Sequence, residues 1–141
     1  MNEPEAIAEI LANAHTVAVV GLTNREGRAS YGVARFLQSQ GYRIIPVNPL
    51  IESALGEMAY PDLDAAVAAH PEIDLVNVFR APEHVPAIVE DVIRLRIPRL
   101  WLQEDVVHPE AAAQAEAAGI RVVMDHCIAK ERMAAGWRHP A

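Results

Sequence analysis

The chain has 141 residues, 52% of them hydrophobic and 22% charged, so it is long enough to bury a core and is not composed like a disordered chain. Its 12 Lys and Arg residues against 19 Asp and Glu residues give a net charge of −7, which argues against broad binding to nucleic acid or to anionic membranes. With Cys127 as its single cysteine, the chain can form neither an intramolecular disulfide nor a cysteine-based zinc cluster. The reducing cytoplasm is therefore the simplest expected location of the protein.

The N-terminal segment shows no targeting signal. Residues 1–5 are acidic and lack the basic region and the continuous apolar core of a signal peptide. No stretch reaches the roughly 18–20 apolar residues that a membrane span requires. We therefore expect one cytoplasmic domain over residues 1–141, with neither a membrane nor a nucleic acid as partner.

Apolar runs of strand length alternate with longer segments of helical period along the chain. The expected strands cover residues 16–20, 42–47, 75–79, 99–103 and 121–124. The expected helices are a leading helix with Ile7 and Ile10, a helix with Val33 and Leu37 that stops near Gly41, a short helix from residues 61–63, a helix with Val85 and Val92 stopped by Pro98, an alanine-rich helix over 109–118 and a final helix after Asp125. The passage through Gly56 is expected to be irregular. Strands joined through helices lie parallel, which predicts a doubly wound, five-stranded parallel sheet in a three-layer α/β/α domain.

In such a sheet, ligands bind beyond the carboxyl ends of the strands. We call the segment that leaves the carboxyl end of a strand its exit. The first exit, residues 21–32, is rich in glycine, hydroxyl and arginine residues. It leads into a helix, whose free N–H groups attract phosphate. The side chains available to a phosphate are those of Thr23, Asn24, Arg25, Arg28 and Ser30. This pattern predicts a phosphate site, with Ser30 also placed to cap the helix. A solvated, charged turn before a capped helix is the alternative.

The first two exits argue against a nicotinamide cofactor. The glycines at 21, 27 and 32 do not fit the G-x-G-x-x-G spacing, because Thr23 stands in place of the second glycine. The second exit reads Val47-Asn48-Pro49, whereas NAD sites usually carry an acidic residue there, and no carboxylate follows until Glu52. Another phosphate ligand is therefore expected; for Asn48-Pro49 alone, a turn is the alternative.

The later exits supply candidate walls of a cleft. At the end of the third strand, Phe79 can lie against a base and Arg80 can meet a phosphate; the alternatives are a core aromatic and a solvated cation. Trp101 and Gln103 share one side of the fourth strand by its period of two. Cys127 is interpreted as a small buried hydrophobe rather than a nucleophile, and no histidine spacing indicates a metal site.

Six segments carry a family resemblance. They are residues 19–24 (VVGLTN), 28–35 (RASYGVAR), 45–49 (IPVNP), 78–82 (VFRAP), 100–103 (LWLQ) and 123–127 (VMDHC). In this order and spacing they resemble the small stand-alone CoA-binding proteins of bacteria and archaea, which look like the N-terminal CoA-binding domain of the succinyl-CoA synthetase α subunit. The similarity covers about residues 5–137 and implies a Rossmann-like fold.

The resemblance implies that the protein binds coenzyme A or an acyl-CoA, with the phosphates against residues 21–32, the nucleotide bordered by residues 47–49 and a further wall from residues 79–82. The residues expected to bind are Gly21, Leu22, Thr23, Asn24, Arg28, Ser30, Tyr31, Gly32, Val47, Asn48, Pro49, Phe79, Arg80, Pro82, Val85 and Gln103. In the related ligases the phosphorylated histidine and the nucleotide-activating parts lie beyond this domain, so we expect binding without catalysis. An NAD(P)- or other nucleotide-dependent enzyme and a regulatory scaffold without ligand are the alternatives.

Two residues depart from the family pattern. Family members commonly have a glycine two residues after Gln103, where this chain has Asp105, and many have arginine where His126 stands. Both changes reduce positive charge or close approach beside the cleft. We expect them to affect the affinity for CoA and the position of its pantetheine arm rather than the existence of the site.

Overall fold

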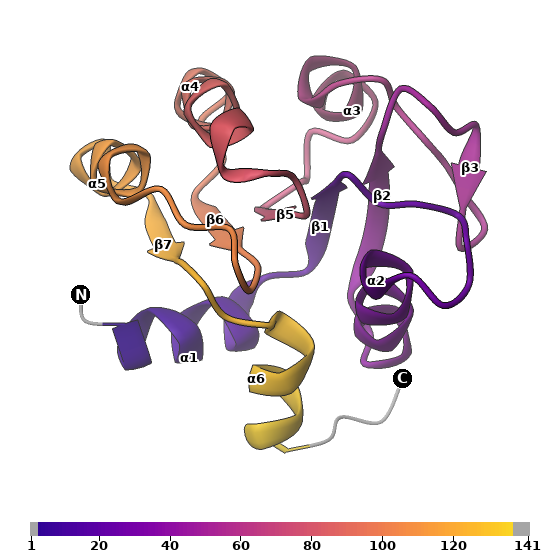
Figure 1. The fold of residues 1–141 in the computed structure, drawn as a ribbon, viewed down its shortest axis with the longest axis horizontal. Coiled ribbons are helices and arrows are strands. Elements are labelled where there is room, and N and C mark those ends of the chain that lie inside the picture. The colour runs from indigo at the N-terminus through magenta and orange to yellow at the C-terminus, as the bar shows by residue number, and fades with distance from the viewer. Residues whose placement is uncertain (1–2, 137–141) are drawn as a thin grey trace.

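The computed structural model describes residues 3–136 and contains a five-stranded parallel sheet between two layers of helices (Figure 1). The sheet strands are β1 (Thr16–Val20), β2 (Arg43–Val47), β5 (Leu75–Val78), β6 (Arg99–Leu102) and β7 (Arg121–Val123). The helices are α1 (Glu3–Asn13), α2 (Ala29–Ser39), α3 (Leu63–Ala69), the 3-10 turn η1 (Pro82–His84), α4 (Val85–Arg94), α5 (Pro109–Ala117) and α6 (Ile128–Ala134). The predicted doubly wound α/β fold is confirmed.

The strand order places a crevice beside β1. The order is β2-β1-β5-β6-β7, and all neighbouring strands are parallel. After β1 the chain moves to the edge strand β2 and then returns to β5 on the other side of β1, so the order reverses between β1 and β5. Val20 pairs with Val47 on one side and with Val78 on the other, so the loops leaving these three strands start side by side. Ligand sites of open α/β sheets lie at such a reversal.

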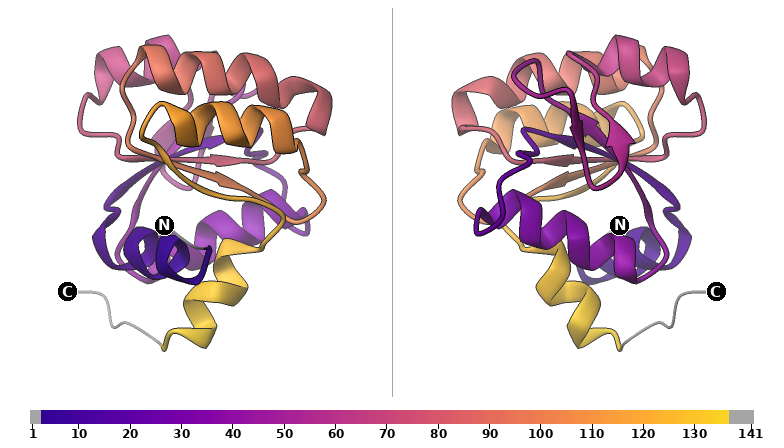
Figure 2. Two further views of the ribbon diagram at one scale, coloured as in Figure 1. Left: turned by 90° about the vertical axis from the view of Figure 1, so that its left-hand side faces the viewer. Right: turned by 90° about the vertical axis from the view of Figure 1, so that its right-hand side faces the viewer.

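Different helices cover the two faces of the sheet (Figure 2). Helices α3, α4 and α5 pack on one face, and α1, α2 and α6 pack on the other. Strand β1 is buried along its whole length, because it lies inside the sheet with helices on both sides. Burial on both faces explains the continuous apolar runs that revealed the strands in the sequence. No helix within residues 3–136 is long and apolar enough to cross a membrane.

The predicted strands are all confirmed, and four of them end or begin one residue earlier or later than expected. The expectation of an irregular passage through Gly56 is wrong, because β3 (Ser53–Ala54) and β4 (Glu57–Met58) form an antiparallel hairpin there. Its two turn residues, Leu55 and Gly56, have φ values of 53° and 79°. Two positive φ angles are typical of the tight turn that matches the twist of a hairpin. Leucine rarely adopts this conformation, so its residue type did not indicate the turn.

Helix α2 begins without the serine cap that the sequence predicted. Arg28 holds the N-cap position with φ −84° and ψ 144°, and its side chain makes no capping hydrogen bond. Ser30 lies inside the first turn, where it is buried and its Oγ accepts a hydrogen bond from the N–H of Thr23 at 3.2 Å. The prediction of a Ser30 cap is therefore wrong. As a result, the first N–H groups of α2 receive no acceptor from the N-cap side chain.

Candidate functional site

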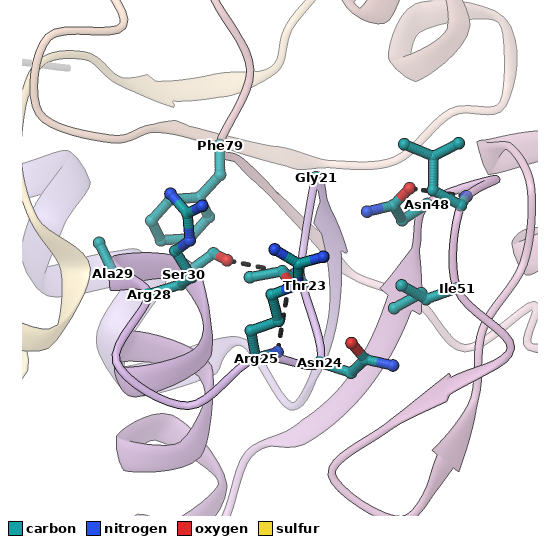
Figure 3. Close-up of a pocket in the computed structure, with 11 residues that line it drawn as sticks. Gly21, Thr23, Asn24, Arg25, Arg28, Ala29, Ser30, Asn48, Ile51 and Phe79 are labelled. Carbon is teal, nitrogen blue, oxygen red and sulfur yellow. Dashed lines mark hydrogen bonds between the residues drawn. The ribbon is translucent and has the colours of Figure 1, made fainter.

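A cavity of about 540 Å³, here called the main cavity, lies beyond the carboxyl ends of β1, β2 and β5 (Figure 3). Its lining residues are Gly21, Thr23, Asn24, Arg25, Arg28, Ala29, Ser30, Asn48, Leu50, Ile51 and Phe79. Figure 3 shows the loop after β1 on one side of Gly21 and the segment after β2, with Asn48 and Ile51, on the other. The main cavity thus occupies the reversal of strand order described above.

Gly21 allows the loop after β1 to pass close to the end of β5. Its φ is +89°, and a Cβ at this position would stand 2.4 Å from the carbonyl oxygen of Phe79. Its N–H donates to the carbonyl oxygen of Val47 at 2.9 Å, which continues the ladder between β1 and β2. Glycine is therefore required here both for its backbone conformation and for the missing side chain.

In the loop after β1, side-chain hydroxyls bind backbone N–H groups, whereas the arginine side chains are not used to hold the loop. The N–H of Arg25 donates to Thr23 Oγ1 at 3.2 Å, and Ser30 Oγ accepts from the N–H of Thr23. Within residues 3–136, the guanidinium groups of Arg25 and Arg28 have no hydrogen-bond or ion-pair partner, and both residues are exposed. No carboxylate is among the lining residues. A chain with a net charge of −7 thus keeps a locally positive site at a helix start, which suits an anion.

Asn48 joins the two sides of the main cavity. Its Nδ2 donates to the carbonyl oxygen of Leu22 at 3.0 Å, and its Oδ1 accepts from the N–H of Leu50 at 2.9 Å. The second bond forms the turn that was the alternative interpretation of this segment. Asn48 therefore fixes the loop geometry, and the acidic residue of an NAD site has no counterpart at the end of β2.

Phe79 and Arg80 point to opposite faces of the sheet. Phe79 is half-buried against the α1/α2/α6 core and lines the main cavity. Arg80 lines a separate cavity of about 220 Å³ on the α3/α4 face together with Val47 and Pro49, and its Nη2 lies 3.1 Å from Nε2 of His84. Successive residues of an extended chain alternate in direction, so the segment expected to form one wall is divided between two cavities.

Gln103 lines a third cavity, of about 370 Å³, which shares Ala29 and Phe79 with the main cavity. Its Oε1 accepts from the N–H of Ile128 at 3.1 Å, so it also holds the start of α6. Trp101, on the same side of the strand, is fully buried and donates from Nε1 to the carbonyl oxygen of His126 at 2.8 Å. Of this pair, Gln103 lines the third cavity and Trp101 does not.

Five of the expected binding residues line none of these three cavities. Leu22 and Val85 are fully buried in the two cores, and Tyr31 is half-buried on α2. Gly32 is exposed inside α2, and Pro82 is exposed at the start of η1. Their assignment to the binding site stays a prediction.

Sequence reasoning missed three residues of the main cavity, namely Ala29, Leu50 and Ile51. Leu50 is 88% exposed and lines the main cavity. Two consecutive apolar residues after Asn48-Pro49 were the available signal, because an exposed apolar side chain beside a cavity is available to a ligand.

The main cavity offers cations and hydrogen-bond donors but little catalytic chemistry. Its lining contains no Asp, Glu, His, Cys or Lys, so no general base stands beside the hydroxyls of Thr23 and Ser30. Within the described part of the chain, no three His, Cys, Asp or Glu side chains gather to hold a metal ion. The arrangement can bind and orient an anionic ligand.

The chain matches the family model described as "CoA binding domain" over residues 15–133. It is 41% identical over 122 residues to the "Uncharacterized protein YneT" of Bacillus subtilis (strain 168), covering 86% of this chain and 88% of that protein. Among solved structures, it is similar to cell-free ID.343 from Thermus thermophilus, with a TM-score of 0.85 and 34% identity over 95% of this chain and 98% of that one. A hypothetical protein from Pyrococcus horikoshii OT3 gives a TM-score of 0.85 and 28% identity over 95% and 92%.

A larger enzyme shares the fold. The dinucleotide-forming acetyl-coenzyme A synthetase 1 of Ca. Korarchaeum cryptofilum superposes with a TM-score of 0.67 at 20% identity. The match covers 82% of this chain but 27% of the synthetase. At this level of identity, the comparison shows a common architecture.

Proposed function

Because this chain belongs to the family of CoA-binding domains, as its six motifs predicted, we propose that it binds CoA or an acyl-CoA in the main cavity and catalyses no reaction there. One observation carries the proposal: within residues 3–136 the guanidinium groups of Arg25 and Arg28 have no partner, and they stand in a cavity lined by no carboxylate. CoA brings a pyrophosphate and a 3′-phosphate, whose charge these groups would neutralise.

The start of α2 supports the same ligand. The side chain of its N-cap residue, Arg28, accepts no hydrogen bond from the first N–H groups of the helix. Free N–H groups and the positive end of the helix dipole favour a phosphate at this position. Phe79 and Ile51 add apolar surface for the uncharged parts of the ligand.

The strand exits favour CoA over NAD(P). The side chain of Asn48 is already engaged with Leu22 and Leu50, and no carboxylate lines the cavity to hold ribose hydroxyls. The same lining, which contains no acid–base pair, supports binding without catalysis. The proposed role is that of a module that holds CoA or one of its thioesters.

Isothermal titration calorimetry of the purified protein tests the proposal with CoA, dephospho-CoA and NAD⁺. We expect CoA to bind in the micromolar range or tighter and dephospho-CoA to bind more weakly, because an arginine meets the 3′-phosphate. Arg28→Ala should weaken CoA binding. The matched control is Arg35→Ala, since Arg35 is an exposed arginine of the same helix that does not line the cavity.

Three results would contradict the proposal. No heat with CoA or short acyl-CoAs at high protein concentration would favour a scaffold that binds no ligand. Preferential binding of NAD⁺ would favour a nucleotide-dependent enzyme. Equal effects of Arg28→Ala and Arg35→Ala would show that the loop does not contact the ligand.

A further inference from the structure

The cavity of about 370 Å³ beside Gln103, here called the acidic groove, continues the main cavity past Phe79. Its residues are Ala29, Val33, Phe79, Gln103, Glu104, Asp105, Val106 and Cys127. The lining is apolar on the α2 side and carries two carboxylates, those of Glu104 and Asp105, from the turn after β6. No Lys or Arg is among these residues. The main cavity shows the opposite pattern, with two arginines and no carboxylate.

The two carboxylates of the acidic groove differ in their surroundings. Glu104 forms an ion pair with Lys130 at 3.1 Å, and both side chains are half exposed or more. The carboxylate of Asp105 has no hydrogen-bond or ion-pair partner within residues 3–136. Asp105 therefore supplies the uncompensated negative charge of the groove.

The backbone holds Asp105 in a conformation that favours glycine. Its φ is +69°, and its N–H donates to Oδ1 of Asp125 at 2.7 Å. Asp125 itself has a φ of +64°, so the exits of β6 and β7 hold each other through two residues in left-handed conformations. Aspartate tolerates this conformation better than most residues, yet glycine adopts it more freely. Asp105 thus places a charge in a left-handed backbone conformation beside a cavity, and such conformations often mark functional sites.

We propose that the acidic groove receives the thiol end of CoA and that Asp105 excludes acyl groups that end in a carboxylate. The inference rests on the proposed function, because the acidic groove shares Ala29 and Phe79 with the main cavity, in which the phosphates would bind. A free thiol or a short uncharged acyl group meets the apolar side of the groove formed by Val33 and Val106. A malonyl or succinyl group places a second negative charge beside Asp105, and the two charges repel in a partly enclosed space.

Malonyl-CoA and isovaleryl-CoA form a matched pair for the test. Their acyl groups have similar branched ends, which are a carboxylate in malonyl and an uncharged isopropyl group in isovaleryl. For the wild-type protein we expect malonyl-CoA to bind about fivefold to tenfold more weakly than isovaleryl-CoA by calorimetry. The difference should shrink at about 1 M salt, which screens exposed charges. In Asp105→Asn the ratio should fall to about twofold.

Two further variants separate charge from loop structure. Asp105→Gly removes the charge and suits the positive φ, so it should narrow the ratio in the same way as Asp105→Asn. Glu116→Gln removes an exposed carboxylate of α5 outside the groove and should leave the ratio unchanged. The inference is overturned if wild type binds both ligands equally or if neither Asp105 variant changes the ratio while CoA still binds. Absence of CoA binding by the wild type would instead overturn the proposed function and, with it, this inference.

Discussion

Charged side chains at the two edges of the central sheet differ in whether they have hydrogen-bond or ion-pair partners. At the amino edge, where the strands begin, charges are paired and satisfied. Arg99 on β6 donates from Nε and Nη2 to the carboxylate of Glu9 on α1 at 2.9–3.2 Å, and both side chains are only 14% exposed. The carboxylate of Asp74, before β5, accepts the N–H groups of His15 and Thr16 at 3.0 Å. These contacts connect the ends of α1, β1, β5 and β6.

At the carboxyl edge, Arg25, Arg28 and Asp105 have no such partners within the described residues, although all three line cavities. A paired charge at the amino edge contributes to folding, whereas an unpaired exposed charge at the carboxyl edge contributes little to it and is available to a ligand. Substitutions at the two edges should therefore differ in effect: those at the amino edge lower stability, and those at the carboxyl edge lower affinity for the ligand.

Gly21→Ala tests whether the carboxyl edge also carries a structural requirement. The new Cβ would collide with the carbonyl oxygen of Phe79 in a left-handed conformation. Overpacking and the strained φ together should lower the free energy of unfolding by about 2–5 kcal/mol. Gly27→Ala is the matched control, because Gly27 has a φ of +87° but no atom within 4 Å of an added Cβ. Urea denaturation of both variants measures the difference, and equal losses would contradict the role of the close approach.

Glu9→Ala tests the amino edge. It leaves the Arg99 guanidinium partly buried without its carboxylate, which should lower the free energy of unfolding by about 2–3 kcal/mol. The affinity for CoA should stay that of the wild type, since Glu9 lies at the opposite edge from the main cavity. Urea denaturation and calorimetry on the same samples measure both quantities. If Glu9→Ala kept its stability and bound CoA more weakly, Glu9 would act in ligand binding rather than in folding.

The same ion pair predicts a pH dependence. The hydrogen bond from Arg99 lowers the pKa of Glu9 below its ordinary value. The contribution of the pair is therefore fully present above the pKa in the unfolded chain, about 4.3, and is lost as the pH falls through the lower pKa of the folded protein. Denaturation curves below about pH 4.3 should show the stability of wild type approaching that of Glu9→Ala. Parallel pH profiles of the two proteins would count against this mechanism.

The difference between the edges also explains what the sequence could reveal. Continuous apolar runs such as those of β1 and β5 predicted the sheet, because a strand buried on both faces must be apolar throughout. The exits then followed from topology, and the loop at 21–32 and Asn48 do meet at the main cavity. Side-chain directions at the exits were harder to predict. Phe79 and Arg80 are adjacent in sequence yet belong to different cavities.

Backbone conformations that contradict local preference could not be inferred from residue types. Leu55 turns the β3–β4 hairpin at a positive φ, and Asp105 adopts a φ of +69°. Ser30 was assigned to the N-cap because serine favours it, but its hydroxyl accepts from Thr23 instead. Tertiary contacts decided each case.

Arg25→Ala and Arg28→Ala sharpen the assignment of the carboxyl edge. Each substitution removes one charge from the main cavity and should weaken CoA binding about tenfold, or ~1.4 kcal/mol, while changing stability by less than about 0.5 kcal/mol. Dephospho-CoA then distinguishes their roles. The arginine that meets the 3′-phosphate should matter for CoA and not for dephospho-CoA in calorimetry. A fall in stability comparable to that of Glu9→Ala would show that the loop cations act in folding.

Substitution of His126 should have the smallest effect on stability. Its contact belongs neither to the paired charges of the amino edge nor to the unpaired charges of the carboxyl edge. It follows β7 at the carboxyl edge, yet its Nε2 lies 2.8 Å from Oε1 of Glu3 and its Nδ1 lies 3.5 Å from Oε2 of Glu131. Burial opposes its protonation, but the hydrogen bond and the charges of these two carboxylates outweigh burial and raise the pKa of His126.

The raised pKa means that this contact stabilises the fold fully below the unfolded value of about 6.5 and loses its effect as the pH rises through the folded value. Since the imidazole is one-third exposed, we expect less than about 1 kcal/mol. Thermal unfolding of wild type and His126→Asn across neutral pH measures the effect, with His15→Asn as the control. The stability difference should vanish at the alkaline end. If the effect of His126→Asn on CoA affinity also changes with pH, His126 acts in ligand binding. It would then belong with the unpaired charges of the carboxyl edge.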